Sequence, residues 1–257
     1  MMPYFVKKTH PSARTAHPHQ SAGAILPKRI YFAPYQLAVM MAAWRRACVL
    51  CHQSLSVRGL ICQACQASIP TQLPPVSVAL NEAGGALRIF ALSYYQHPMN
   101  ALITQFKDHE RIDALVALVA LIRTLPKPLH CTADNTVIVP VPTTMSRMRE
   151  RGFNPVLILA KYLAVHWGIP LWQGVLRQDG ERHQRGLDRQ ARLQNPSADF
   201  YLAAPVPTRQ VIIFDDVVTT GATLAAMAEL IKGVQPQVRL LGICLAHGTA
   251  EFGLHTR

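Results

Sequence analysis

Two adjacent carboxylates stand at the end of an apolar run and precede a short loop of threonine and glycine. The run covers Val211–Phe214, the acids are Asp215 and Asp216, and the loop leads into an apolar helix expected to extend to Ile231. A buried strand that passes through such a loop into a helix directs backbone N–H groups and the positive end of the helix at one point. This point suits a phosphate, and the carboxylates can accept hydrogen bonds from sugar hydroxyls. The residues therefore predict a site for a sugar phosphate such as ribose 5-phosphate.

The residues of the loop are small or hydroxylated. Glycine lets the backbone approach a ligand closely, and threonine hydroxyls add hydrogen-bond donors. The residues expected to bind the phosphate are Thr219, Thr220, Gly221, Ala222 and Thr223. The alternative is a strand that ends in two solvated acids, followed by a threonine that caps the helix. The agreement of apolar run, acid pair, loop and helix favours the phosphate site.

A second group of charged residues follows the strand expected at Val137–Val141. Arg147, Arg149 and Arg151 occupy alternating positions in what we expect to be a loop. Arginine forms bidentate hydrogen bonds with phosphate and pyrophosphate oxygens, so this segment suits an anionic ligand. For any single arginine, a solvated position in a basic loop is the alternative.

Four cysteines form two Cys-x-x-Cys pairs separated by ten residues. They are Cys48, Cys51, Cys62 and Cys65. Two such pairs supply the four thiolates of a tetrahedral Zn²⁺ site, which has no open position for water and is therefore structural. A redox pair or unrelated cysteines are the alternative. Cys131 and Cys244 fall in an expected loop and an expected strand and are predicted to bind no metal.

The remaining pattern alternates strands with helices, which predicts an α/β fold with a doubly wound parallel sheet. The expected strands cover 87–95, 137–141, 211–216 and 238–246. The expected helices cover 37–47, 99–106, 112–125, 155–165 and the segment from the Thr/Gly loop to 231. Asn154 and Pro155 suit the cap and the first position of the fourth helix. Residues 177–197 are rich in Arg and Gln and predict a long loop.

Composition narrows the choice of partners. Half of the 257 residues are apolar and the net charge is +12, which favours polyanions such as nucleotides, pyrophosphate or nucleic acid. The longest apolar stretch, 114–122, is too short to cross a bilayer, so we expect no membrane insertion. The amino terminus lacks an apolar signal core, which predicts a cytoplasmic protein.

The acid pair and its loop resemble the signature with which phosphoribosyltransferases bind phosphoribosyl pyrophosphate (PRPP). The resemblance implies that Asp215 and Asp216 hold the ribose hydroxyls as the catalytic acids, and that the amides of 219–223 hold the 5′-phosphate. It implies that the arginine segment at 147–151 binds the pyrophosphate. Mg²⁺ is the cofactor that accompanies PRPP in that family.

A narrower resemblance is to the ComF family of competence-associated, phosphoribosyltransferase-like proteins. It covers about residue 45 to 247 and is carried by four motifs in order: the four-cysteine zinc ribbon, an aromatic and Phe-Lys segment, Arg-x-Arg-Gly-Phe-Asn, and a middle loop. The second motif is Tyr95, Phe106 and Lys107, and the fourth is Gln184, Leu187, Arg189, Arg192 and Asn195. Pro155 departs from the family, where many members have Gln.

The family resemblance implies a type I phosphoribosyltransferase-like domain at 71–257 and a zinc ribbon with its preceding helix at 35–70. Residues 1–34 have no counterpart and read as a disordered tail. The middle loop is implied to be flexible and to close over the site through Gln184, Arg189 and Arg192, with Arg182 and Arg185 as further candidates for the pyrophosphate.

Two functions remain open at this point. In the first, the chain is a PRPP-binding protein of DNA uptake and utilisation in natural transformation, with single-stranded DNA and a helicase-like competence protein as partners. In the second, it is an active phosphoribosyltransferase of nucleotide metabolism whose acceptor is unidentified. Whether the chain forms a homodimer is also open.

Overall fold

The computed structural model describes residues 41, 46–48, 50–55, 61–69, 71, 73–81, 83–178 and 199–248. Several predicted features lie outside the described residues. They are the tail at 1–34, most of the helix at 37–47, and the middle-loop residues Arg182, Gln184, Arg185, Arg189 and Arg192.

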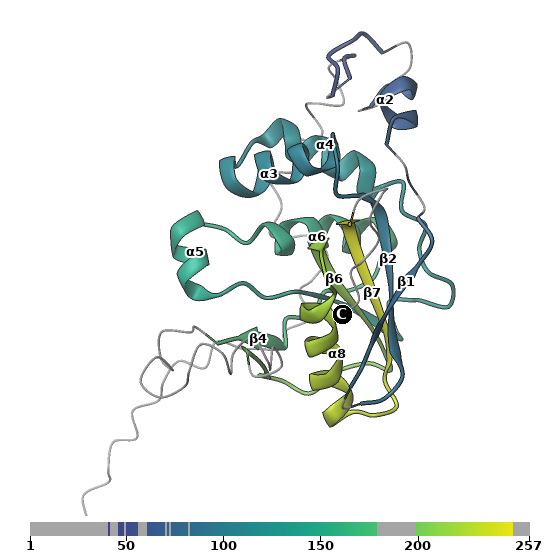
Figure 1. The fold of residues 1–257 in the computed structure, drawn as a ribbon, viewed down its shortest axis with the longest axis vertical. Coiled ribbons are helices and arrows are strands. Elements are labelled where there is room, and N and C mark those ends of the chain that lie inside the picture. The colour runs from purple at the N-terminus through teal and green to yellow at the C-terminus, as the bar shows by residue number, and fades with distance from the viewer. Residues whose placement is uncertain are drawn as a thin grey trace, which may run out of the picture.

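Five strands form one sheet in the order β1-β2-β7-β6-β3 (Figure 1). Their bounds are β1 (Val76–Ala79), β2 (Ala86–Tyr94), β3 (Thr136–Pro140), β6 (Gln210–Val218) and β7 (Arg239–His247). Strands β2, β7, β6 and β3 run parallel, and β1 pairs antiparallel with β2 at the edge. This confirms the predicted α/β class with a parallel sheet.

The described residues also form helices. They are α2 (Gln63–Ala67), α3 (Met99–His109), α4 (Ile112–Ile122), α5 (Met145–Arg151), α6 (Pro155–Trp167) and α8 (Ala222–Val234). Helix α6 begins as the sequence predicts, because the Asn154 side chain accepts a hydrogen bond from the Leu157 N–H at 3.1 Å and Pro155 occupies the first turn. It ends at Gly168, whose φ of 66° only glycine adopts without strain.

The core lies on both faces of the sheet. Strand β3 is buried along its whole length and β6 is buried from Val211 to Phe214, as expected for parallel strands covered on both sides. Helix α6 packs against β3 and β6, and α8 packs against β6 and β5. The carboxyl ends of β2, β7 and β6 lie in register at Tyr94, His247 and Val218, which defines one edge of the sheet. In open parallel sheets, ligands bind outside this edge.

The structure adds elements that the sequence pattern did not predict. Strand β1 follows the proline-rich segment at 70–75, and β4 (Val175–Arg177) pairs with β5 (Phe200–Leu202) in a separate two-stranded sheet. Three or four residues are too few to produce a clear apolar period, so such short strands are seen only through their pairing.

The arginine segment was predicted as a loop, and this prediction was wrong: residues 145–151 form helix α5. Thr144 caps this helix by accepting a hydrogen bond from the Arg147 N–H at 3.3 Å, and Gly152 ends it with a φ of 76°. Arg and Met are good helix formers, so a cap and a terminating glycine suffice for two turns. Within the described part of the chain, no helix combines the length and apolar character needed to cross a membrane.

Candidate functional site

The acid pair lies inside β6 rather than after it, because the strand continues to Val218. Successive side chains of a strand point to opposite faces, so the two carboxylates leave β6 in opposite directions. Asp216 is 2% exposed, whereas Asp215 keeps part of its surface accessible. Each carboxylate also accepts a hydrogen bond from the next backbone N–H, at 2.9 Å for Asp215 and 2.8 Å for Asp216. The two acids therefore meet different surroundings, although they are adjacent in sequence.

Asp216 is paired with a lysine from another element. The Nζ atom of Lys107, near the end of α3, lies 2.7 Å from Oδ2 of Asp216, in an ion pair that lacks the angles of a hydrogen bond. The Lys107 side chain is 29% exposed and that of Asp216 is 3% exposed. A buried carboxylate needs a partner to remain charged, and Lys107 supplies one.

Asp215, unlike Asp216, forms no ion pair among the described residues. Desolvation raises the pKa of its carboxyl well above the ordinary value, and the neighbouring negative charge of Asp216 raises it further. The more distant Lys107 only partly offsets this rise. Desolvation dominates even though part of the residue surface is exposed. Two acids with such different surroundings are typical of functional sites, where proximity and burial separate the pKa values of neighbouring groups.

The loop after β6 leads directly into α8. Thr219 and Thr220 are exposed, and Gly221 precedes the helix with a φ of 78°. The Oγ1 atom of Thr220 accepts a hydrogen bond from the Ala222 N–H at 3.3 Å, but no side chain caps α8 from its N-cap position at Gly221. The N–H groups at this helix start are the ones that the sequence predicts to bind a phosphate.

Gly221 is needed for a reason that the sequence did not reveal. A Cβ atom at this position would lie 2.5 Å from Cγ2 of Val78 on β1. Its positive φ is also a conformation that residues with a side chain avoid. The edge strand β1 therefore leaves no room for a side chain at position 221, whether or not a ligand approaches the loop.

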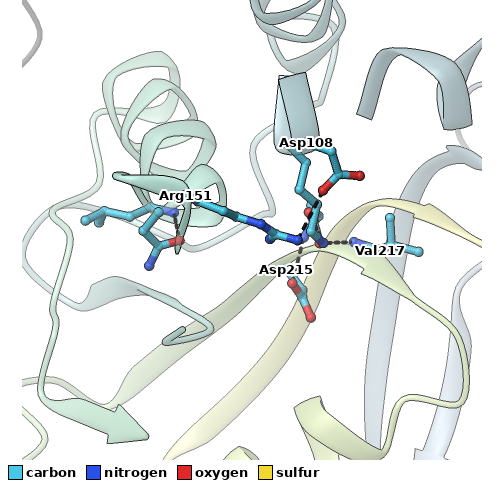
Figure 2. Close-up of polar contacts among 8 residues, drawn as sticks. Asp108, Arg151, Asp215 and Val217 are labelled. Carbon is cyan, nitrogen blue, oxygen red and sulfur yellow. Dashed lines mark hydrogen bonds and ion pairs between the residues drawn. The ribbon is translucent and has the colours of Figure 1, made fainter. Parts of the chain in front are cut away.

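The three predicted arginines do not share one environment. Arg147 and Arg149 are exposed on α5, whereas Arg151 is half-buried and its Nη2 donates a hydrogen bond to Oδ1 of Asp108 at 3.1 Å. Figure 2 shows Arg151 reaching Asp108 close to the strand that carries Asp215. Asp108 follows Lys107 on α3, so this one helix contacts both α5 and β6.

An aromatic contact strengthens the link between α3 and the segment after α5. The rings of Phe106 and Phe153 lie 5.5 Å apart, and Phe106 is buried. Phe106 and Lys107 were expected at the site only from the family resemblance. Asp108 was missed, because a charged residue at the end of a helix is usually solvated.

A buried histidine at the same edge was also missed. His247 ends β7, is 3% exposed and stands edge-on to Tyr94 with ring centroids 5.8 Å apart. Among the described residues, neither of its ring nitrogens has a hydrogen-bond partner. Desolvation lowers the pKa of His247 below its ordinary value, so the ring is neutral at neutral pH. A histidine directly after the expected strand at 238–246 was the available signal.

The four cysteines converge on one point. Their sulfur atoms all lie within 4.8 Å of one another, and these cysteines are not joined by disulfides. A tetrahedral zinc with Zn–S bonds of about 2.3 Å needs S–S separations of about 3.8 Å, which this group can adopt with small shifts. The cluster therefore fits a structural Zn²⁺ in a ribbon, as the sequence predicted.

Local hydrogen bonds prepare the cysteine sulfurs for a metal. The Cys48 sulfur accepts from the N–H groups of Leu50 at 3.4 Å and Cys62 at 3.3 Å, and the Cys62 sulfur accepts from the Cys65 N–H at 3.4 Å. Burial acts to raise the pKa of Cys48, but the hydrogen bonds outweigh it and lower this pKa to about 6. The thiolate of Cys48, which is the form that binds zinc, is thereby favoured. Desolvation and the neighbouring sulfur atoms instead raise the pKa of Cys65.

Comparison with known proteins gives consistent relatives. The chain is 31% identical over 193 residues to the DNA utilization protein YhgH of Salmonella typhimurium, covering 72% of this chain and 83% of that protein. It is 29% identical over 191 residues to YhgH of Escherichia coli, with the same coverage. It is 27% identical over 231 residues to Competence protein F of Haemophilus influenzae, covering 80% of this chain and 100% of that protein. No protein-family model matches. These relatives, the four-cysteine cluster and the α/β fold together show that the chain belongs to the ComF family.

Proposed function

We propose that the chain binds PRPP at the carboxyl edge of its sheet and acts in DNA uptake or utilisation. The names of its relatives, a DNA utilization protein and a competence protein, support the cellular role. One observation carries the PRPP assignment: α8 starts at Gly221, without a side-chain cap there, immediately after the strand that holds the acid pair. A helix start whose N-cap residue supplies no side-chain cap, next to carboxylates, suits a ligand that is both a phosphate ester and a sugar.

In this proposal, three elements share the ligand. The N–H groups of residues 219–223 bind the 5′-phosphate, and Asp215, which keeps exposed surface, accepts hydrogen bonds from ribose hydroxyls. Arg147 and Arg149 are exposed on α5 and bind the pyrophosphate with its accompanying Mg²⁺. Asp216 is paired with Lys107 and Arg151 with Asp108, so these two residues hold the site in place and do not contact the ligand directly.

The phosphate position is tested by adding a negative charge where the phosphate binds. The variant Thr220→Glu places a carboxylate at the start of α8, where it repels a phosphate but stabilises the helix by about 0.3–1 kcal/mol. We expect the Kd for PRPP to rise about tenfold or more in isothermal titration calorimetry, which corresponds to about 1.4 kcal/mol. The thermal midpoint should not fall.

The matched control is Gln237→Glu, which adds the same charge on the exposed turn beyond the other end of α8. This control should leave PRPP affinity within about twofold of the parent, because exposed charges beyond a Debye length are screened. Equal PRPP affinity in the two variants would contradict the proposed phosphate position.

A second candidate function is transfer of the phosphoribosyl group to an acceptor base. The observation that favours it is the raised pKa of Asp215 beside a charged partner, since such groups are concentrated at catalytic sites. Zinc-loaded chain, PRPP, Mg²⁺ and a panel of nucleobases are incubated together, and pyrophosphate release is followed. Release that is lost in Asp215→Asn supports an enzyme. PRPP binding without release supports a binding protein.

The DNA-related role predicts direct contact with single-stranded DNA, and a helicase-like competence protein is the expected protein partner. The net charge of +12 provides the electrostatic attraction. Fluorescence anisotropy of a labelled oligonucleotide, between about 50 and 200 mM salt, should show affinity that falls steeply as salt rises. Measuring the same curve with Cys48→Ser reveals whether the zinc ribbon contributes. Affinity independent of salt would argue against backbone recognition.

A further inference from the structure

Both oxygens of the Asp216 carboxylate are already engaged by the chain. Oδ1 accepts a hydrogen bond from the Val217 N–H at 2.8 Å, and Oδ2 lies 2.7 Å from the Lys107 ammonium. Oδ2 has less than 1 Å² of exposed surface, and the side chain as a whole is 3% exposed. A ligand that needs Oδ2 must therefore displace Lys107.

Lys107 is held in place by the helix that carries it. Its two sequence neighbours both make contacts beyond α3: Phe106 packs on the Phe153 ring, and Asp108 pairs with Arg151 at 3.1 Å. These contacts fix the last turn of α3 against α5. The ammonium therefore stands at the acid pair as a built part of the site, unlike a surface lysine that reaches an acid by chance.

This arrangement does not fit a divalent cation on the acid pair. Mg²⁺ requires oxygen ligands in near-octahedral geometry and favours ionised carboxylates. Asp216 is engaged on both oxygens, and the raised pKa of Asp215 disfavours its ionised form. The Lys107 ammonium would also repel a second cation from the same position.

We propose that Lys107 is the built-in counter-ion of Asp216, so that the acid pair engages its sugar ligand through Asp215 and binds no divalent cation of its own. The statement about the sugar ligand rests on the proposed PRPP function. The statement about the cation does not, because it concerns the chain alone. Mg²⁺ that arrives with PRPP then stays on the pyrophosphate.

The test uses Mn²⁺ as a paramagnetic probe for a divalent site. Full-length, zinc-loaded chain is titrated with Mn²⁺, and free Mn²⁺ is measured by electron paramagnetic resonance. Thiolates prefer zinc to Mn²⁺, so the cysteine cluster does not interfere. The variants are Lys107→Met, which removes the charge but keeps the length, and Lys127→Met, which removes an exposed lysine elsewhere.

We expect the parent chain and Lys127→Met to bind Mn²⁺ equally weakly, and Lys107→Met to bind it about tenfold more tightly, because the freed carboxylate becomes a ligand. Adding Asp216→Asn to Lys107→Met should remove the gain. A well-folded Lys107→Met that binds Mn²⁺ no more tightly than the parent would overturn the proposal. If Lys107→Met does not fold, Lys107→Gln takes its place in the same titration. Strong binding of Mn²⁺ by the parent chain also overturns the proposal.

A second measurement separates this inference from the proposed function. Ribose 5-phosphate carries the sugar and phosphate but no pyrophosphate. It is titrated by calorimetry in two buffers, one that contains Mg²⁺ and one that contains neither Mg²⁺ nor EDTA. We expect its affinity for the parent chain to change less than about twofold, where a coupled metal would change it about fivefold or more. A fivefold change overturns the counter-ion role. Absence of any binding, with the Mn²⁺ results as expected, overturns the PRPP assignment alone.

Discussion

Gly221→Ala provides the sharpest test of how the loop before α8 is held. The new Cβ atom would lie 2.5 Å from Cγ2 of Val78, a distance at which one of the two groups must move. Val78 is β-branched, so its side chain has few alternative rotamers, and it lies on β1, paired with β2. The alanine must also adopt the φ of 78° that Gly221 has.

The two effects can be estimated separately. A residue with a side chain in the left-handed region costs about 1–2 kcal/mol relative to glycine. Inserting a methyl group into a packed site costs about 1–3 kcal/mol. The variant should therefore lose about 2–5 kcal/mol of unfolding free energy. For a chain of this size the thermal midpoint shifts by about 2–4 °C per kcal/mol, so it should fall by about 4–20 °C.

Circular dichroism of zinc-loaded protein during heating and urea titration measures this loss. The control is Gly233→Ala, on the same helix, where a Cβ atom meets nothing within 4 Å and stability should rise by up to about 1 kcal/mol. In a Val78→Ala background the packing part of the Gly221→Ala penalty should disappear, leaving about 1–2 kcal/mol. An unchanged penalty in that background would refute the packing argument, and no penalty at all would refute the conformation of the loop.

Four further substitutions address the cysteine cluster and the buried titratable groups. Cys48→Ser should reduce the zinc released to a chromogenic chelator from about one ion per chain to a small fraction, whereas Cys131→Ser, away from the cluster, should retain it. Asp215→Asn should stabilise the chain at neutral pH, because the raised pKa of Asp215 in the folded chain means that its ionised form opposes folding. Asp216→Asn should instead destabilise the chain by about 1–3 kcal/mol, because Lys107 loses its counter-charge. Urea titration distinguishes the two signs. In the folded chain the pKa of His247 lies below its ordinary 6.5, so the unfolded chain binds more protons and stability should be lost as pH falls from about 6.5 through the folded pKa. His247→Phe should flatten that part of the curve of stability against pH. An unchanged slope would count against burial of a neutral ring.

Part of the site could be read from the sequence because it is local. The apolar run, the acid pair and the loop before α8 are consecutive, so their order fixes a strand, a turn and a helix start. The same holds for the cap of α6 at Asn154 and Pro155, where one side chain and one ring set the first turn. The spacing of the four cysteines likewise predicted their convergence.

The partners of the charged residues could not be read in this way. Lys107 meets Asp216 across 109 positions of sequence, and Arg151 meets Asp108 across 43. Nothing local distinguishes these residues from solvated charges on helix ends. The arginine segment was predicted as a loop because its alternating charges show no apolar period, although good helix formers between the Thr144 cap and Gly152 form α5.

The sequence by itself determined the fold class, the convergence of the four cysteines and the position of the loop before α8, because each depends on residues close together along the chain. Only the tertiary structure decided that the two acids face apart, that Lys107 neutralises one of them, and that His247 is buried beside Tyr94. The reason is physical: burial and ion pairing arise when distant segments pack and exclude water, and no local pattern specifies which charge will be left inside with which partner.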